Sequence, residues 1–152
     1  MTQDADAELL AYRLDPSSNH TAWLVWHSSR VLDRHHANLA DVEQIWIRNG
    51  WVDRFGLDLD PQDHGYGHTS EQVARVQVSD PTDLRAYHAD VDQQVRVTLR
   101  SFSADDLDRV IDVRDGVPIT CGVRIVSFLD DAIQHLGQAA YLRGLYLQAA
   151  AG

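Results

Sequence analysis

The spacing of apolar residues predicts three long amphipathic helices joined by irregular segments. The first helix is expected over residues 19–48, opened by the capping residues of DPSSN and closed by Asn49-Gly50. His27 stands one turn from both Leu24 and Val31, so its imidazole is predicted to point inward. The apolar side of this helix consists of Trp23, Leu24, Val31, Leu39, Val42, Ile45 and Trp46.

A second long helix is predicted to begin at SDPTD, with Asp80 as the N-cap and Pro81 in the first helical position, where its missing N–H is harmless. Its inner stripe is Leu84, Tyr87, Val91, Val95, Leu99 and Phe102. Residues 50–80 are too rich in Gly, Asp and single polar residues for one regular element, and a connection of this length is usually functional. Such a connection lets the first two long helices run parallel.

The segments that follow carry turn and capping signals. SADDLDRV predicts a short capped helical turn, and VIDVRDGVPIT fits either a small hairpin around Asp115-Gly116 or a loop. Thr120 is a suitable cap for a last helix that ends near Ala149. These elements predict an all-α helical bundle, although a bundle usually closes with four helices and residues 1–15 are too short and too acidic to supply another of equal length.

The last helix has polar side chains inside its apolar seam. The seam follows a 3-4-3-4-3 spacing and consists of Phe128, Asp131, His135, Gln138, Leu142 and Leu145. A carboxylate buried without a partner costs several kcal/mol, so a second group should compensate Asp131. A metal ion would compensate the Asp131 carboxylate. For an i,i+4 Asp-His pair with no other evidence, a simple hydrogen bond between the two in a hydrated crevice is the commoner outcome.

In a bundle, inward groups on different helices converge. His27 of the first long helix is therefore the natural third partner of Asp131 and His135. Two imidazoles and one carboxylate cap one face of an ion and leave positions open for water or substrate, as in catalytic zinc and non-haem iron sites. The spacing alone is a moderate signal, because many i,i+4 Asp/His pairs bind nothing.

Composition places this fold in a cellular setting. With 152 residues and 44% hydrophobic content, the chain fits one domain over residues 1–152. The net charge of -10 argues against nucleic acid and anionic membranes as partners, and no apolar run approaches the roughly 20 residues of a membrane span. The single cysteine, Cys121, and the lack of a signal-peptide pattern favour the cytoplasm. Every basic residue is Arg, which is typical of a GC-rich bacterial genome.

Three stretches, NHTAWLVWHSSRVLDRHH, DHGYGHTSEQVARV and DDAIQHLGQAAYLRGL, resemble the DinB-like superfamily, specifically its actinobacterial branch related to mycothiol-dependent maleylpyruvate isomerase. The resemblance runs from about Glu8 to the end of the chain. It implies a DinB-like helical bundle with a long crossover between the second and third bundle helices. The leading helix of the family is shortened here to AELLAYRLDP, so either a partner subunit or an upstream start would complete the bundle.

The resemblance also implies a divalent metal site and a thiol. In this superfamily a His of the second bundle helix and an H-x-x-x-H or E-x-x-x-H pair of the last helix hold the ion, and these positions are His27, Asp131 and His135 here. The shorter Asp131 departs from that pattern and would weaken the site or change the preferred metal among Zn, Ni and Fe. The implied thiol is mycothiol, which a coordinating metal can deprotonate.

The candidates for a catalytic role are Gln138, His68 and Arg30. Gln138, one turn beyond the metal pair, would orient a ligand or a bound water, and a core amide bonded to the backbone is equally expected. His68 and His64 flank GYG in the connection and are either acid-base groups at the mouth of the site or, more commonly, solvated loop residues. Arg30 and Arg34 either hold a substrate carboxylate or pair with surface Asp, which is the commoner fate.

Other residues have simpler interpretations. His35 and His36 are adjacent and point to different faces, so they cannot both join His27 as ligands. Cys121 at a helix start has either a lowered thiol pKa or, more commonly, the role of a small buried hydrophobe. The tryptophans are expected to be mostly core residues and are Trp23, Trp26, Trp46 and Trp51.

The leading functional hypothesis is a metal-dependent transferase or isomerase that uses mycothiol on a small electrophilic substrate. The alternative is a non-catalytic dimeric bundle that binds a metal or a small ligand, and the ligand set by itself also suggests an iron oxygenase. A homodimer is expected because three helices leave one flank of the seam uncovered.

Overall fold

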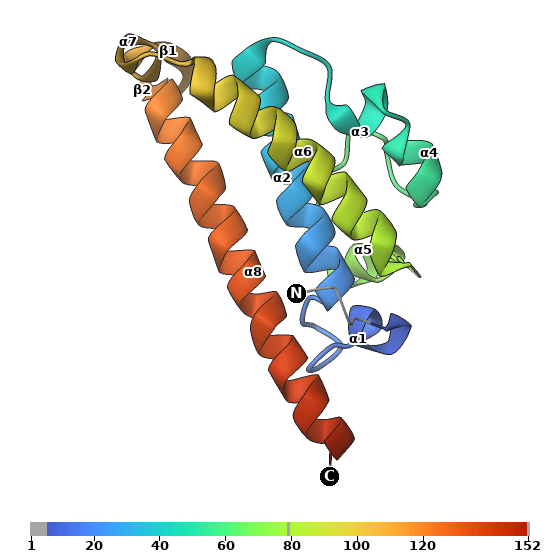
Figure 1. Cartoon of the computed structure of the whole chain (residues 1–152). Helices are drawn as coiled ribbons and strands as arrows, with labels where there is room; N and C mark the ends of the chain where they lie inside the picture. Colours follow the sequence, from blue (N-terminus) through green and yellow to red (C-terminus); the bar gives the residue numbers. More distant parts are fainter. Residues whose placement is uncertain (1–5, 79, 152) are drawn as a thin grey trace.

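Three long helices form the body of the protein, whose computed structural model describes residues 6–78 and 80–151. They are α2 (Thr21–Ala40), α6 (Pro81–Ser101) and α8 (Cys121–Ala151). Helix α2 packs against both of the others, whereas α6 and α8 make few contacts with each other. Figure 1 shows α6 running in the same direction as α2, with α8 running against them. The predicted all-α bundle with a long crossover is therefore confirmed.

The core is built around α2, which is buried over most of its length. One hydrophobic cluster of the described residues joins α2 to the inner faces of α6 and α8, and all four tryptophans belong to it, as predicted. Its best-buried large side chains include Trp26, Leu24, Tyr87, Leu84, Val91 and Phe128. Among the described helices, none combines the length and the apolar character needed to cross a lipid bilayer.

The first long helix is shorter than the apolar pattern predicted. It ends at Ala40, where Asp41 takes a left-handed conformation with φ of 53° and caps the helix. A separate short helix, α3 (Ile45–Arg48), follows in place of the continuous helix expected to residue 48. The carboxylate of Asp33 accepts the first two backbone N–H groups of α3, each at 2.8 Å. A buried side chain thus starts a new helix, which hydrophobic periodicity does not reveal.

Besides α3, the connection between α2 and α6 contains the short helices α4 (Trp51–Phe55) and α5 (Ser70–Arg75) and is otherwise irregular. Helix α5 begins with a capping box in which the side chains of Thr69 and Gln72 each bond the backbone of the other residue. The connection returns along the bundle to the start of α6, where Asp80 is the N-cap and Pro81 the first helical residue, as predicted (Figure 1).

The remaining elements are α1 (Ala7–Ala11), α7 (Ala104–Asp108), β1 (Val110–Arg114) and β2 (Val117–Thr120). Helix α1 has five residues and packs on α2. Asp115 and Gly116 both have positive φ, 51° and 78°, as a two-residue hairpin turn requires. The strands pair antiparallel, so the hairpin interpretation is confirmed over the loop. The Thr120 hydroxyl accepts the N–H of Val123 at 3.3 Å, which confirms the cap of α8.

A buried ion pair ties the connection to α2. The side chains of Arg30 and Asp33 are both fully buried, with a guanidinium nitrogen 3.4 Å from the carboxylate. Arg30 also donates to the backbone carbonyls of Asp63 at 3.1 Å and Pro61 at 3.3 Å. The hydroxyl of Tyr87 on α6 donates to Asp33 at 2.9 Å. The sequence suggested that Arg30 would bind a substrate carboxylate or pair with an Asp at the surface. The structure shows neither, because Arg30 is buried and its N–H groups bond Asp33 and the connection.

Replacing Asp33 by Asn should strongly destabilise the fold. The charge of Arg30 would stay buried without its counter-charge, and breaking a buried pair in this way costs about 3–5 kcal/mol. Urea denaturation of the metal-free protein measures the free energy of unfolding. The control is Asp92→Asn, which removes an exposed pair with Arg96 and should change stability little. An equally small effect of Asp33→Asn would show that the buried pair is not needed.

Candidate metal centre and substrate pocket

Two antiparallel helices bring the three predicted ligands together. His27 lies on α2, and Asp131 and His135 lie one turn apart on α8. His27 Nε2 is 3.9 Å from Asp131 Oδ2, and His135 Nε2 is 3.6 Å from Asp131 Oδ1. One donor atom from each residue lies within 4.8 Å of the other two. An ion about 2 Å from each donor requires donors no more than about 4 Å apart, so these three side chains would hold one ion after a small inward shift.

Each imidazole of this cluster has its second ring nitrogen engaged. Nδ1 of His27 donates to the backbone carbonyl of His64, which can only accept. Nδ1 of His135 lies 2.9 Å from the amide oxygen of Gln138, which is also an acceptor. Both contacts leave the Nε2 lone pairs free to face Asp131. Gln138 is exposed and contacts His135, so it is not the core amide that the sequence also suggested, and its orienting role stays a prediction.

The electrostatics of the cluster suit a metal ion. Burial lowers the pKa of His27 to about 4, against the opposing effects of the His64 carbonyl and Asp131. The imidazole is therefore neutral at neutral pH, which is the form that binds metals. Oδ2 of Asp131 is buried and has no hydrogen-bond partner. Neutral imidazoles and a free carboxylate oxygen form a donor set that fits a divalent transition metal.

Tight packing holds His27 in place. The ring of Trp23 stacks on the imidazole with centroids 4.5 Å apart and an interplanar angle of 9°. The connection crosses beside this stack at Gly65, whose φ is 92°. A Cβ at Gly65 would lie 2.8 Å from His27 Nδ1 and 3.1 Å from Trp23. This close approach brings the His64 carbonyl to His27 and requires glycine at position 65.

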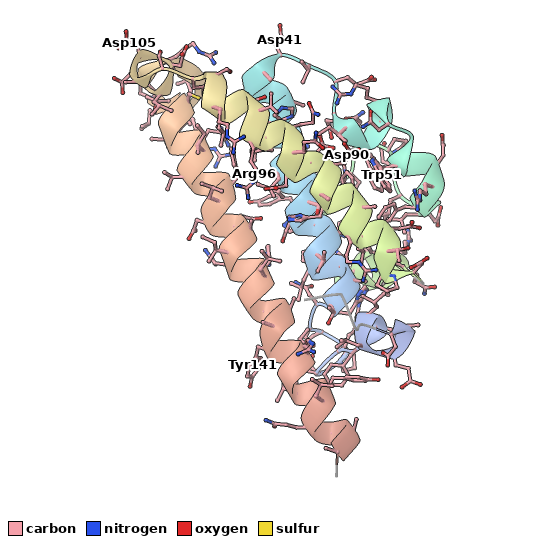
Figure 2. All side chains as sticks on the ribbon, in the orientation of Figure 1. Asp41, Trp51, Asp90, Arg96, Asp105 and Tyr141 are labelled. Carbon is pink, nitrogen blue, oxygen red and sulfur yellow. The ribbon has the colours of Figure 1, made fainter. Side chains whose placement is uncertain are left out.

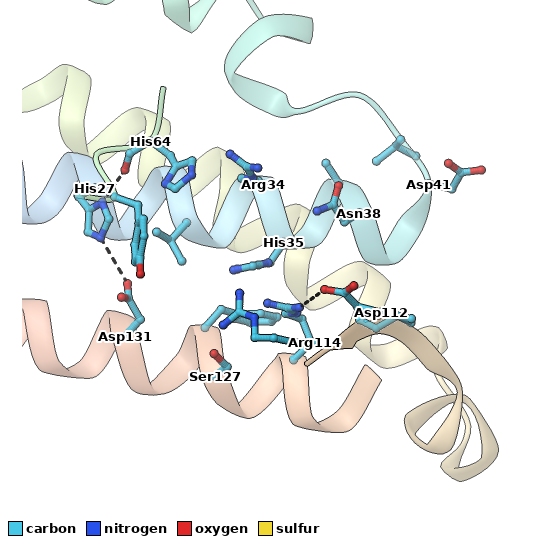
Figure 3. A pocket seen from close by; sticks show the side chains of 17 residues that line it. His27, Arg34, His35, Asn38, Asp41, His64, Asp112, Arg114, Ser127 and Asp131 are labelled. Carbon is cyan, nitrogen blue, oxygen red and sulfur yellow. Dashed lines mark hydrogen bonds and ion pairs between the residues drawn. The ribbon is translucent and has the colours of Figure 1, made fainter. Parts of the chain in front are cut away.

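A pocket of about 790 Å³ opens beside the ligands (Figure 3). Its walls come from α2, the 64–66 loop, β1 and α8. His27 and Asp131 lie at one end of the pocket, and the hairpin lies toward the other. The polar residues that line the space between them are Arg34, His35, Asn38, His64, Asp112, Arg114, Arg124 and Ser127.

The part of the pocket away from the metal ligands is basic. Arg124 donates to Asp112 at 2.9 Å. His35 stacks on Phe128, and burial, followed by the charges of Arg124 and Arg34, lowers its pKa to about 4. The pKa of the His64 imidazole is also lowered, by burial first and then by Arg34. A further positive charge is disfavoured at both rings, as expected for a region of positive potential.

The histidines and arginine proposed for the mouth of the site have different positions. His68 does not line the pocket, because its Nε2 donates to Asp63 at 2.9 Å and its Nδ1 accepts the indole N–H of Trp23 at 3.1 Å. It orients Trp23 and does not face the space where a substrate would bind, so its candidacy as a catalytic group is not supported. His64 and Arg34 do line the pocket. The sequence favoured a surface Asp as the partner of Arg34, but no carboxylate among the described residues forms an ion pair with it.

Two further residues follow their simpler interpretations. His35 faces the pocket, whereas His36 makes a 2.9 Å hydrogen bond with Thr98 on α6, so the adjacent rings do point to different faces. Cys121 is fully buried, and burial raises the pKa of its thiol. The cysteine is therefore a small core residue and not a reactive one.

Sequence reasoning missed Arg114, Arg124 and Gly65. A signal for Arg124 exists, because it precedes Asp131 by seven residues and so shares its face of α8. Arg114 ends a strand directly before the Asp115-Gly116 turn, and nothing local shows that this hairpin faces the pocket. The need for glycine at position 65 has no sequence signal, because it arises from a stack between two rings on another element.

The fold and the cluster define a DinB-like helical bundle in which two histidines and one carboxylate converge beside a pocket. A family model described as mycothiol-S-transferase matches residues 1–148, so the chain belongs to the mycothiol-S-transferase family. Among solved structures, a conserved protein from Enterococcus faecalis is similar, with a TM-score of 0.88 and 31% identity over 95% of this chain and 85% of that chain. A comparison with curated proteins finds no match. The resemblance seen in the sequence is thus confirmed at the family level.

Gly65→Ala should displace the His27 ring from its hydrogen bond. Gly67→Ala is a matched control, because Gly67 also has a positive φ, 74°, but has open space where a Cβ would stand. Both variants place alanine at a positive φ, which strains the backbone. In Gly65→Ala the new Cβ also clashes with His27 and Trp23, so its free energy of unfolding should be lower still, by about 1–3 kcal/mol. Long-range proton–nitrogen NMR spectra report the tautomer of His27, which should change only in Gly65→Ala. An identical change in both variants would argue against the packing role of Gly65.

Proposed function

We propose that this protein is a metal-dependent transferase or isomerase that presents mycothiol to a small electrophilic substrate. The observation that carries the proposal is the convergence of His27, Asp131 and His135, because His27 and Asp131 also line one end of a pocket of about 790 Å³. Membership in the mycothiol-S-transferase family supports the choice of thiol. Zn, Ni and Fe are the candidate metals, because imidazole nitrogen suits all three.

The residues of this chain would position the reactants. His27, Asp131 and His135 would hold a divalent ion from one side, so that its other side faces the pocket. Such an ion lowers the pKa of a coordinated thiol, which supplies a thiolate at neutral pH. The His64 carbonyl and the Gln138 amide keep both Nε2 lone pairs aimed at the ion, so little reorganisation is needed on binding. The rest of the pocket would receive the electrophile.

A non-catalytic bundle that binds a metal or a small ligand is the alternative function. The two functions share the metal site and differ in whether the protein catalyses a reaction. Metal analysis therefore tests the shared metal site, and kinetic assays with and without metal distinguish the two functions.

Protein purified without added metal should carry one divalent ion per chain, and His135→Ala should lose it, because two remaining ligands are too few for a stable site. Inductively coupled plasma mass spectrometry measures the metal content. His88→Ala is a matched control, since His88 contacts Ser29 on the α6 side of the bundle, away from the cluster. Stoichiometric metal in His135→Ala would rule out the proposed ligand set.

The metal-loaded protein should accelerate the reaction of mycothiol with at least one small electrophile, and a chelator should abolish the acceleration. The ion keeps the thiol ionised, so the rate below about pH 7 should fall less than the ionisation of a free thiol with a pKa of about 8.5 requires. A stopped assay over a panel of electrophiles measures both effects. If no electrophile reacts faster than the uncatalysed control, or if chelation leaves the rate unchanged, the non-catalytic function is preferred.

We also propose that two copies associate through the outer face of α8. Val126, Ile133 and Tyr141 are 67%, 70% and 65% exposed on the side of α8 that faces away from α2. Apolar area costs roughly 25 cal/mol for each Å² left in water, and a symmetric dimer would cover this face. Sedimentation velocity at micromolar concentration should show a dimer, and Ile133→Asp should shift it to monomer. A compact wild-type monomer would contradict the dimer.

A further inference from the structure

Two arginines on opposite walls of the pocket have charges that no carboxylate of the described residues neutralises. Arg34 projects from α2, and Arg114 projects from the end of β1. Figure 3 shows both side chains along the pocket, on either side of His35. Neither forms an ion pair within the part of the chain that the structure describes. Arg124 of α8, which also lines the pocket, differs from them because Asp112 neutralises its charge.

Carboxylates are abundant in this protein, so the lack of partners is informative. The chain has 23 acidic residues against 13 basic ones, and its net charge is -10. Three aspartates line the pocket: Asp112 is paired with Arg124, Asp131 belongs to the metal cluster, and Asp41 lies at the outer end of the pocket (Figure 3). The pocket therefore keeps two uncompensated guanidinium groups within an acidic molecule.

The arginines lie within reach of a ligand that also touches the metal cluster. Arg34 follows His27 by seven residues on α2, which corresponds to about 10 Å along the helix at ~1.5 Å per residue. Figure 3 shows Arg114 across the pocket from Arg34, on the other side of His35. An arginine side chain spans part of this distance, so a compact molecule can contact both places.

We propose that Arg34 and Arg114 bind a carboxylate of the electrophilic co-substrate. This rests on the proposed thiol transfer and names its substrate class: a small electrophile with a carboxylate several bonds from the reacting carbon. Guanidinium groups present paired donors that match the two oxygens of a carboxylate. With an unsaturated acid, the thiol S–H and the C=C π bond would be converted into one S–C and one C–H bond, so the addition needs no further reactant.

Calorimetric titration of the zinc-loaded protein with trans-cinnamate and with trans-cinnamamide tests the subsite directly. The two probes have nearly the same shape and differ in charge. We expect the wild type to bind cinnamate about tenfold more tightly than the amide, which corresponds to about 1.4 kcal/mol. Arg34→Gln and Arg114→Gln should each reduce this preference to about twofold. Arg100→Gln, an exposed residue of α6 outside the pocket lining, is the matched control and should retain the preference.

The same titrations on chelator-treated protein separate the subsite from the metal and from the transferase function. A preference that depends on both arginines and survives chelation supports the subsite, even if no electrophile turns over. A preference that persists in both variants and disappears on chelation assigns the carboxylate to the metal and overturns the proposal. Equal binding of the two probes by the wild type also overturns it. If the variants raise only the KM for mycothiol and leave cinnamate binding unchanged, the arginines bind the thiol and the proposal is wrong.

Discussion

Arg30 and Asp33 lie one turn apart on α2 and neutralise each other in the core, and each also binds the backbone of the crossover connection. Asp33 fixes the beginning of the connection by binding the first N–H groups of α3. Arg30 fixes a later part through the carbonyls of Pro61 and Asp63. The next carbonyl along the chain, that of His64, accepts the hydrogen bond of His27. One buried pair thus links the course of a long irregular segment to the tautomer of His27, a candidate metal ligand.

Much of the fold could be predicted because local chemistry decides it. Asp80 with Pro81, Thr120 and Asp115-Gly116 each act within a few residues of themselves, and the structure has the expected caps and turn at all of them. The convergence of the ligand cluster was also predictable, because helical spacing leaves few places for inward polar groups in a bundle. The end of α2 at Ala40 was not predictable, because the side chain of Asp33, seven residues earlier, bonds the backbone of a segment beyond the helix.

The roles of individual polar residues were harder to predict than the elements that carry them. Arg30 and His68 have side chains suited to binding and catalysis, and tertiary hydrogen bonds use them for packing instead. The residue type determines which interactions a side chain can make, whereas its neighbours in the fold determine which of them it makes. Gln138 and Arg34 illustrate the opposite outcome, since Gln138 contacts the candidate ligand His135 and Arg34 lines the pocket. The E. faecalis protein, at 31% identity and a TM-score of 0.88, shows that this architecture persists through many substitutions.

The hairpin differs from every other wall of the pocket in how it is held. Neither β1 nor β2 contains a fully buried residue, whereas α2 and α8 supply much of the core. Changes in the hairpin would therefore alter the outer pocket at a small cost in folding free energy, and they would leave His27, Asp131 and His135 where they are. The molecule separates a part that must stay fixed from a part that is free to vary. Adaptation to a new ligand and maintenance of a stable fold can thus act on different residues of the same short chain.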